Sequence, residues 1–197
     1  ADSAQKYAGS TPLKGMVKTV SNLSILIAGV GGQGTLLASR ILGSVAMKKG
    51  YDVKVSEVHG MSQRGGSVVT YVRMGEKVHS PIVEKRMADI VLAFERLEAL
   101  RWIDYLKDGG KLIINDQRIN PMPVIMGKEK YPENIVEKIK RVFPNTQAMD
   151  ALSIARACGN ARAINVVLIG LMAKSTAIEK EVWLEAIREN VPPKYLE

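Results

Sequence analysis

Near its amino-terminal end the chain has a short apolar run that stops at a glycine-rich turn and is followed by a helical pattern. The segment LSILIAG, which begins at Leu23, is followed by VGGQGT and then by TLLASRILGSVAMKKG. Leu37, Ile41 and Val45 recur at helical spacing, and Gly50 follows the run as glycine commonly follows a helix. This pattern predicts a buried strand, a tight turn and an amphipathic helix, which together open many α/β sheets.

The rest of the chain continues the alternation of strands and helices. A second strand, YDVKVSEV, follows directly and completes a βαβ unit. Further strands are expected at 67–74, 90–94, 111–115 and 146–149, and helices at 95–106, 133–142, 151–157, 161–175 and 179–189. The proline-bearing segment 119–132 is expected to be a loop that covers a site or meets a partner. We therefore expect a three-layer α/β/α, Rossmann-like domain with a mainly parallel or mixed sheet.

Length and composition suit one globular domain. The chain has 197 residues, of which 46% are hydrophobic and 24% charged. Residues 1–15 are small, polar and aperiodic, so we interpret them as a cloning remnant or a disordered arm, with a genuine extension as the alternative. Residues 16–197 are then the single folded domain. The longest apolar stretch, 161–173, is interrupted by Arg162 and Asn165 and falls short of the roughly 20 residues that cross a bilayer, so no membrane contact is predicted.

Charge and cysteine usage narrow the function further. A formal net charge of +8 suits an anionic partner such as a nucleotide, a nucleic acid or an acidic protein surface. The lysines and arginines are scattered and no nucleic-acid-binding motif accompanies them, so we predict no nucleic-acid partner. Cys158 is the only cysteine, which excludes an intrachain disulfide and a cluster held by four cysteines of this chain. With no signal peptide evident, a cytoplasmic location is predicted.

The glycine turn GVGGQGT, residues 29–35, is the first candidate site. Glycines let backbone N–H groups approach an anion closely, and the following helix directs its positive dipole end to the same point. The candidate phosphate-binding residues are therefore Gly31, Gly32, Gln33, Gly34 and Thr35. A purely structural strand-to-helix turn is the alternative.

A nicotinamide dinucleotide is a second interpretation of the same turn. Gly29, Gly31 and Gly34 have the spacing that this ligand uses, and Glu57 lies near the expected place for an acid that binds its ribose. A self-sufficient NAD(P)-dependent Rossmann dehydrogenase is therefore the alternative function.

The segment VHGMSQRGGS weighs against a dehydrogenase, because its glycines interrupt the helix that a dinucleotide-binding fold would have there. Arg64 beside two glycines suits a carboxylate or a phosphate, and we group it with the glycine turn as a phosphate-ligand or subunit contact. A further polar site is predicted at His59, Gln63, Gly65 and Gly66, because histidine exchanges protons near neutral pH and glutamine binds amides or carbonyls. A packed histidine and an arginine paired within the protein are the alternatives. No catalytic residue and no metal ligand is assigned.

Four segments, in order, resemble the gamma-type domain of the 2-oxoacid:ferredoxin oxidoreductases. They are GVGGQGTLLASRILG, EVHGMSQRGGSVVTYVRMGEKVHSPIV, ADIVLAFERLEALR and NVVLIGLMAK, and the resemblance covers roughly residues 23–189. The residues HGMSQ directly before RGG are similar to those of the indolepyruvate, or arylpyruvate, branch of the family. This segment is more specific to the family than the glycine turn is.

This resemblance implies a division of labour between subunits. The whole enzyme decarboxylates a 2-oxoacid on thiamine diphosphate with magnesium, reduces ferredoxin through iron–sulfur clusters, and transfers the acyl group to coenzyme A. No GDG segment for thiamine diphosphate occurs in this chain, and one cysteine cannot ligate a cluster. We therefore expect these cofactors on a larger alpha subunit, no activity of this chain alone, and coenzyme A as the ligand to test at the interface. Two roles stay open: completing the active-site wall or coenzyme A channel, and docking the alpha chain during assembly.

Overall fold

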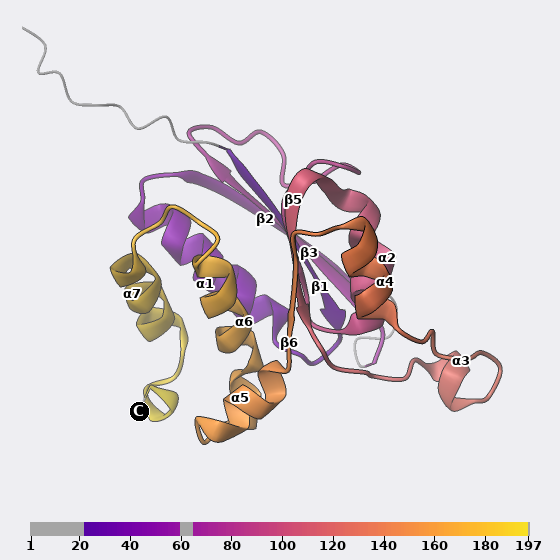
Figure 1. Ribbon diagram of the computed structural model, residues 1–197. Helices are drawn as coiled ribbons and strands as arrows, with labels where there is room; N and C mark the ends of the chain where they lie inside the picture. Colours follow the sequence, from indigo (N-terminus) through magenta and orange to yellow (C-terminus); the bar gives the residue numbers. More distant parts are fainter. Residues whose placement is uncertain (1–21, 60–64, 197) are drawn as a thin grey trace, which may run out of the picture.

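The computed structural model describes residues 22–59 and 65–196, which form a six-stranded sheet covered by helices (Figure 1). In chain order the elements are β1 Leu23–Val30, α1 Thr35–Lys48, β2 Asp52–His59, β3 Ser67–Gly75, β4 Ala88–Ala93, α2 Arg96–Trp102, β5 Leu106–Asn115, α3 Met122–Ile125, α4 Ile135–Val142, β6 Thr146–Met149, α5 Ala151–Ala157, α6 Ile164–Ala173 and α7 Lys180–Asn190. Short 3₁₀ turns at Ile103–Tyr105, Ala161–Ala163 and Pro193–Tyr195 adjoin the helices.

The sheet has the strand order β2-β3-β1-β4-β5-β6. Strands β1, β4, β5 and β6 pair in parallel, whereas β3 is antiparallel to both β1 and β2. The sheet is therefore mixed, which confirms the expected fold class. It refines the expected βαβ unit, because β3 lies between β1 and β2. The burial pattern gives the reason: seven of the nine β3 residues are buried, as a central strand requires, whereas β2 is half exposed.

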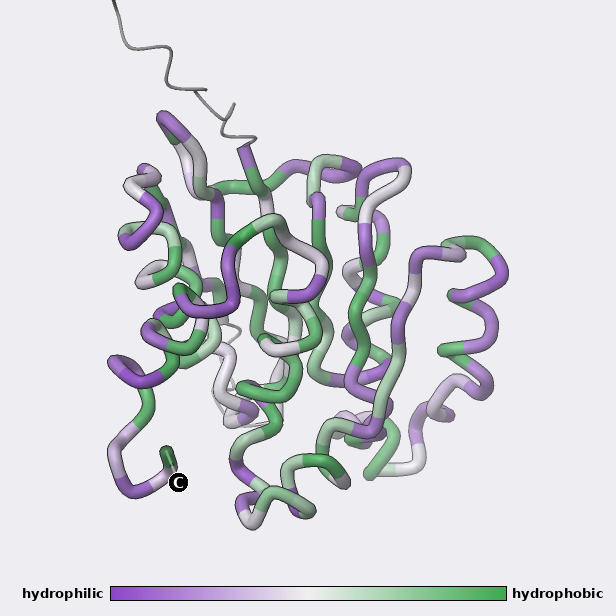
Figure 2. Tube along the Cα trace, turned by 60° about the vertical axis from the view of Figure 1, so that its left-hand side comes forward, coloured by the Kyte–Doolittle hydropathy of each residue, from purple (hydrophilic) through white to green (hydrophobic). Residues whose placement is uncertain are grey.

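Alternating side chains of the strands build two cores, one on each face of the sheet. Ile25 and Ile27 of β1 point into the core beneath α1, α6 and α7. Leu26 and Ala28 point to the opposite face, which α2 and α4 cover. Figure 2 shows the hydrophobic residues concentrated along the central strands between these two helical layers. The period of two along a strand thus produces the three-layer arrangement.

The largest difference from the expected element boundaries lies between α2 and β5. The helix expected at 95–106 ends at Trp102, and β5 already begins at Leu106. The early start of β5 is possible because Ala88 pairs with Leu106 while Ile90 pairs with Lys111, so the intervening residues bulge out of register. Gly109 adopts a positive φ of 73° inside this bulge, a conformation that glycine takes without steric cost.

The segment 119–132, which was expected to be a loop, carries the single helical turn α3. In Figure 1 this segment projects away from the body of the domain. Its apolar side chains Met122, Ile125 and Met126 are exposed.

Candidate functional site

The polar residues of the site lie where the parallel strands end, at the carboxyl edge of the sheet. In open α/β sheets ligands bind at this carboxyl edge, next to the point at which successive crossovers switch faces. Here β1 leads to α1 on one face, and the neighbouring β4 leads to α2 on the other. The glycine turn after β1 therefore lies at the switch point of the sheet.

The two glycine segments predicted from the sequence meet at this edge. The backbone N–H of Gly31 donates to the carbonyl of Gly66 at 2.9 Å. Gly65, just before β3, is exposed and has a φ of 76°, a conformation that glycine adopts without steric cost. The predicted residues Arg64 and Gln63 lie outside the described residues, and of His59 only the backbone is described, paired with Val68.

Some backbone N–H groups of the glycine turn donate hydrogen bonds to other described residues, and others do not. Besides Gly31, Gln33 donates its N–H to the Val30 carbonyl at 3.1 Å. Gly34 begins α1 in the left-handed region, at φ 84°, without a side-chain cap. The N–H groups of Gly32, Gly34 and Thr35 make no backbone hydrogen bond outside the regular elements of the described chain, and a helix supplies no partner for its own first N–H groups. These three donors can receive an anionic oxygen.

The side chain of Gln33, which was predicted as a ligand contact, forms hydrogen bonds within the protein. Its side-chain oxygen accepts from the Val30 N–H at 2.8 Å, and its Nε2 donates to the Phe94 carbonyl at 3.0 Å. The same Nε2 lies 3.5 Å from Oε1 of Gln117. The Gln33 amide therefore ties the ends of β1 and β4 together and fixes the shape of the turn.

A second amide continues this connection to β5 and β6. Asn115 is fully buried, and its Nδ2 donates to the Phe94 carbonyl at 3.1 Å and to Gln117 Oε1 at 2.9 Å. Its Oδ1 accepts from the Ala151 N–H at 3.1 Å, at the start of α5. Side-chain amides thus link four strand ends, which makes this edge of the sheet preorganised.

Glu95, directly after β4, is a buried carboxylate with four hydrogen bonds. Its Oε2 accepts from the N–H groups of Leu97 and Glu98 at 2.5 and 3.0 Å and so caps α2. Its Oε1 accepts from the Ile119 N–H at 3.0 Å and from the Tyr131 hydroxyl at 2.5 Å. Burial, followed by the hydrogen bond to Glu95, raises the pKa of Tyr131 above its ordinary value of 10.0, so the hydroxyl remains a donor. Glu95 therefore anchors both ends of the projecting segment that contains α3.

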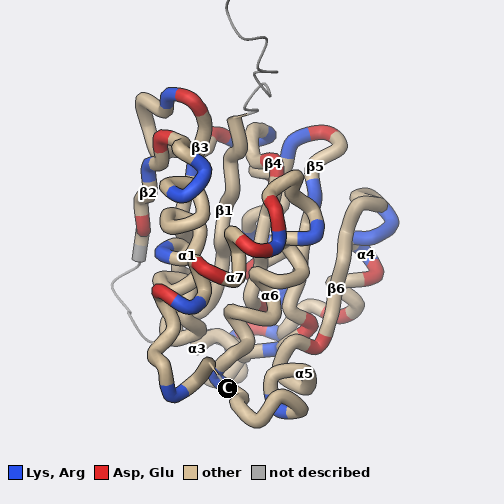
Figure 3. The backbone as a smooth tube through the Cα atoms, turned by 90° about the vertical axis from the view of Figure 1, so that its left-hand side faces the viewer, with Lys and Arg blue, Asp and Glu red and all other residues tan. Residues whose placement is uncertain are grey.

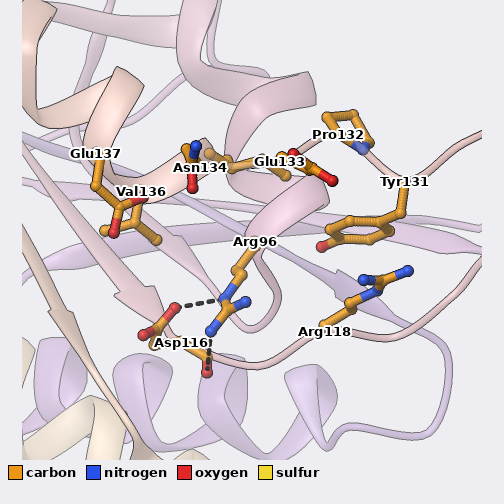
Figure 4. A pocket seen from close by; sticks show the side chains of 10 residues that line it. Arg96, Asp116, Arg118, Tyr131, Pro132, Glu133, Asn134, Val136 and Glu137 are labelled. Carbon is orange, nitrogen blue, oxygen red and sulfur yellow. Dashed lines mark hydrogen bonds and ion pairs between the residues drawn. The ribbon is translucent and has the colours of Figure 1, made fainter.

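A polar cavity of about 260 Å³ opens beside these residues (Figure 4). Arg96 forms one wall, and its Nε donates to Asp116 Oδ1 at 2.5 Å. The Arg118 guanidinium lies 4.4 Å from the centre of the Tyr131 ring. Asn134, in the left-handed region at φ 54°, begins α4 on the other side. Two cations line the cavity, but the carboxylates of Asp116, Glu133 and Glu137 line it as well, so its described lining carries no excess of positive charge for an anionic ligand.

Glu98 connects the start of β3 to α2. The Ser67 hydroxyl donates to Glu98 Oε2 at 2.5 Å, and Arg101 donates to Oε1 at 2.8 Å. Burial raises the pKa of Glu98 in spite of these contacts, which act to lower it. These hydrogen bonds hold Ser67, which follows the second glycine segment, against α2.

Sequence reasoning missed Glu95, Arg96, Asn115, Asp116 and Gln117. The available signal was position, since each lies at or directly after the end of a predicted parallel strand. Glu57, the acid that a dinucleotide would require, pairs with Thr70 of β3, which in turn pairs with Ile27. A whole strand therefore separates Glu57 from the strand that carries the glycine turn, and this arrangement does not favour the dehydrogenase interpretation.

Three further findings concern the described residues. Within 22–59 and 65–196, no group of three or more histidine, cysteine, aspartate or glutamate side chains is placed to hold a metal ion. In the same residues, no helix is long and apolar enough to cross a membrane. Cys158 is exposed.

Comparison with known proteins gives a consistent result. The family model described as "Pyruvate ferredoxin/flavodoxin oxidoreductase" matches residues 24–197. The chain is 46% identical over 178 residues to the indolepyruvate oxidoreductase subunit IorB of Pyrococcus horikoshii, covering 87% of each protein. Its fold is similar to that of the keto/oxoacid ferredoxin oxidoreductase gamma subunit of Geobacter sulfurreducens, with a TM-score of 0.64, 23% identity, and 88% and 89% of the two chains covered.

A third match places the same fold inside a longer chain. In the 2-oxoglutarate:ferredoxin oxidoreductase of Magnetococcus marinus, solved with 2-oxoglutarate, coenzyme A and succinyl-CoA bound, the TM-score is 0.64 at 17% identity. The match covers 89% of the present chain but only 28% of that protein. The fold thus occurs both as a separate chain and as one part of a larger one.

Proposed function

Because the chain belongs to the pyruvate ferredoxin/flavodoxin oxidoreductase family and is a subunit of a 2-oxoacid:ferredoxin oxidoreductase, we propose that it serves an enzyme of the indolepyruvate type. In this proposal the carboxyl edge of its sheet forms part of the coenzyme A channel. A larger subunit carries thiamine diphosphate, magnesium and the iron–sulfur clusters, and passes electrons to ferredoxin. The substrate assignment rests on the identity to indolepyruvate oxidoreductase subunits.

One observation carries the assignment of the channel to this edge: the Gly31 to Gly66 hydrogen bond, which brings the two glycine segments together. The contact places Gly65 and the start of β3 against a turn whose Gly32, Gly34 and Thr35 N–H groups form no hydrogen bond to another described residue and can bind an anion. Coenzyme A carries several phosphate oxygens, and the net charge of +8 favours its approach. Coenzyme A supplies the thiol that accepts the acyl group; the present chain binds and orients its phosphates.

The test uses the complete enzyme, co-expressed with its larger subunit and assayed by arylpyruvate-dependent viologen reduction. Omitting this chain should abolish the activity, and unchanged activity would contradict any essential role. In the complete enzyme, Arg64→Ala should raise KM for coenzyme A by about tenfold, the equivalent of one charge-assisted hydrogen bond, with kcat and subunit composition unchanged.

A matched control separates this effect from a general loss of positive charge. Arg188→Ala removes a guanidinium from α7, on the helical layer beneath one face of the sheet, and should leave KM for coenzyme A unchanged. If Arg64→Ala instead prevents the two subunits from co-purifying, the segment docks the larger subunit and the channel assignment is wrong. If KM rises equally in both variants, the effect is long-range electrostatics and the site is elsewhere.

A further inference from the structure

Strand β2 is the edge strand of the sheet that the described residues form. Among residues 22–59 and 65–196 it pairs with β3 alone, and its register runs without interruption from the Asp52 and Gly75 pair to the His59 and Val68 pair. The strand is eight residues long and contains no proline. A regular edge of this length presents a row of unpaired N–H and C=O groups, which natural proteins normally cover or interrupt.

The helix beside this edge exposes an apolar face. Leu36 and Met47 of α1 are 48% and 67% exposed, and Val55 of β2 is 44% exposed. Together with Arg40, Gly43 and part of α7 they line a shallow hollow of about 540 Å³. Figure 3 views this face, on which α1 lies between β2 and α7. An exposed helix face that continues onto an open strand is typical of an interaction surface.

The spacing of the residues on this helix face is the same in both directions. Leu36, Arg40, Gly43 and Met47 read apolar, cationic, small and apolar at spacings of four, three and four. If two such helices pack antiparallel about a two-fold axis through their middle, Leu36 faces Met47 of the other copy and Arg40 faces Gly43. A surface that complements itself in this way is what a two-fold symmetric dimer requires.

The distances expected between the two β2 strands and between the two α1 helices fit the same two-fold arrangement. Helix α1 packs mainly on β2 and β3, and therefore lies over the edge of the sheet. Pairing two β2 strands antiparallel about an axis perpendicular to the sheet places them about 4.8 Å apart. A helix centred between β2 and β3 then lies about 10 Å from its copy, at the upper end of the 8–10 Å at which helices pack.

Charge and space at the centre of this face are also complementary. Arg40 is exposed and forms no ion pair with another described residue. A Cβ placed on Gly43 would meet nothing within 4 Å, so an incoming side chain has room there. Beside Gly43, the Glu189 carboxylate of the hollow accepts from Ser44 and Lys48 and retains a half-exposed side chain. Arg40 of one copy can therefore lie across Gly43 of the other and reach its Glu189.

We propose that two copies of this chain associate through this face, with β2 paired to β2 and α1 packed on α1 about a two-fold axis beside Val55. The complete enzyme then contains two copies of the chain in direct contact. The proposal concerns the edge of the sheet formed by β2 and does not depend on the coenzyme A assignment.

Cross-linking tests the contact in the complete enzyme. In a Cys158→Ser background, Val55→Cys should give a covalent dimer of this chain with a short bis-maleimide, because the two side chains flank the axis. Gln147→Cys, an exposed position on the opposite edge strand β6, is the matched control and should give none. A cross-link from Val55→Cys to the larger subunit would show that the partner covers this edge and would overturn the proposal, as would equal reaction at both positions.

Gly43→Arg tests the interface without disturbing the fold. It replaces glycine inside a helix with a better helix former in open space, so thermal stability should be retained or improved. It also places two guanidinium groups against each other across the axis, which should weaken self-association at least about tenfold in sedimentation equilibrium of the chain. A chain that is monomeric before the substitution at every concentration tested, or a Gly43→Arg variant that dimerises as before, would refute the interface.

Discussion

The contact between Gly34 and Asn165 gives the sharpest test of the glycine turn. Gly34 has a φ of 84°, and a Cβ on it would lie 2.6 Å from Nδ2 of Asn165, which is buried at the start of α6. The left-handed conformation costs a residue with a Cβ about 1–2 kcal/mol. Displacing a buried asparagine adds about 1–3 kcal/mol, as overpacking typically does. We expect Gly34→Ala to lower the free energy of unfolding by about 3 kcal/mol.

Two comparisons separate strain from steric overlap. Gly50 has a φ of 71°, and a Cβ there meets nothing within 4 Å, so Gly50→Ala should show the conformational cost alone, about 1–2 kcal/mol. Asn165→Ala removes the side chain that a Cβ on Gly34 would meet. In that background Gly34→Ala should cost no more than Gly50→Ala, which gives a coupling of about 1–2 kcal/mol in the double-mutant cycle.

The assay is urea unfolding of the four variants and the parent chain, followed by far-UV circular dichroism. The m-values should stay constant, so that the midpoints report stability alone. A Gly34→Ala penalty equal to that of Gly50→Ala would refute the close packing of the turn against α6. A penalty that persists after Asn165→Ala would show that another group limits the space at Gly34.

Other buried groups give predictions of the same kind. Glu95→Gln weakens four hydrogen bonds to a charged acceptor and should cost about 2–3 kcal/mol in urea unfolding, whereas Glu133→Gln, an exposed control, should change stability by less than about 0.5 kcal/mol. Tyr131→Phe removes one of those bonds and should cost about 1 kcal/mol by the same assay. Burial raises the pKa of Glu98 above 4.5, so the folded state holds this proton more tightly than the unfolded state, and its contribution to stability is present in full below about pH 4.5 and declines as pH rises. The stability of the parent chain minus that of Glu98→Gln should therefore fall with pH, and a difference that grows would contradict the shift.

The layers of the fold could be predicted from the sequence because each follows from a local period. The alternation of Ile25 and Ile27 against Leu26 and Ala28 defines two faces of β1, and the helical spacing after Thr35 defines α1. The position of β3 could not be predicted, since strand order depends on which strands compete for the buried centre of the sheet. We expected β5 only from residue 111, so the bulge at Gly109 within this strand was not predicted.

The candidate site was only partly predictable for a related reason. The glycine segments were found because glycine at fixed spacing has few structural uses, and the structure brings Gly31 and Gly66 into contact. The hydrogen bonds of Gln33 to the ends of β1 and β4 were not foreseen, since an amide side chain gives no sign in the sequence of which backbone groups it will reach. Glu95 is a similar case: its four partners lie between two and thirty-six residues away along the chain.

Helix α1 belongs to both proposals, because its first turn lies in the candidate channel and its exposed face in the proposed dimer interface. The buried face of the helix, which includes Ala38, Ile41, Leu42 and Val45, holds it against the sheet independently of that interface. A helix fixed by its own core should not move when the second copy leaves. We therefore expect Gly43→Arg in the complete enzyme to abolish the Val55 cross-link while KM for coenzyme A stays unchanged. A joint change in both would mean that the second copy, rather than the core, positions the glycine turn.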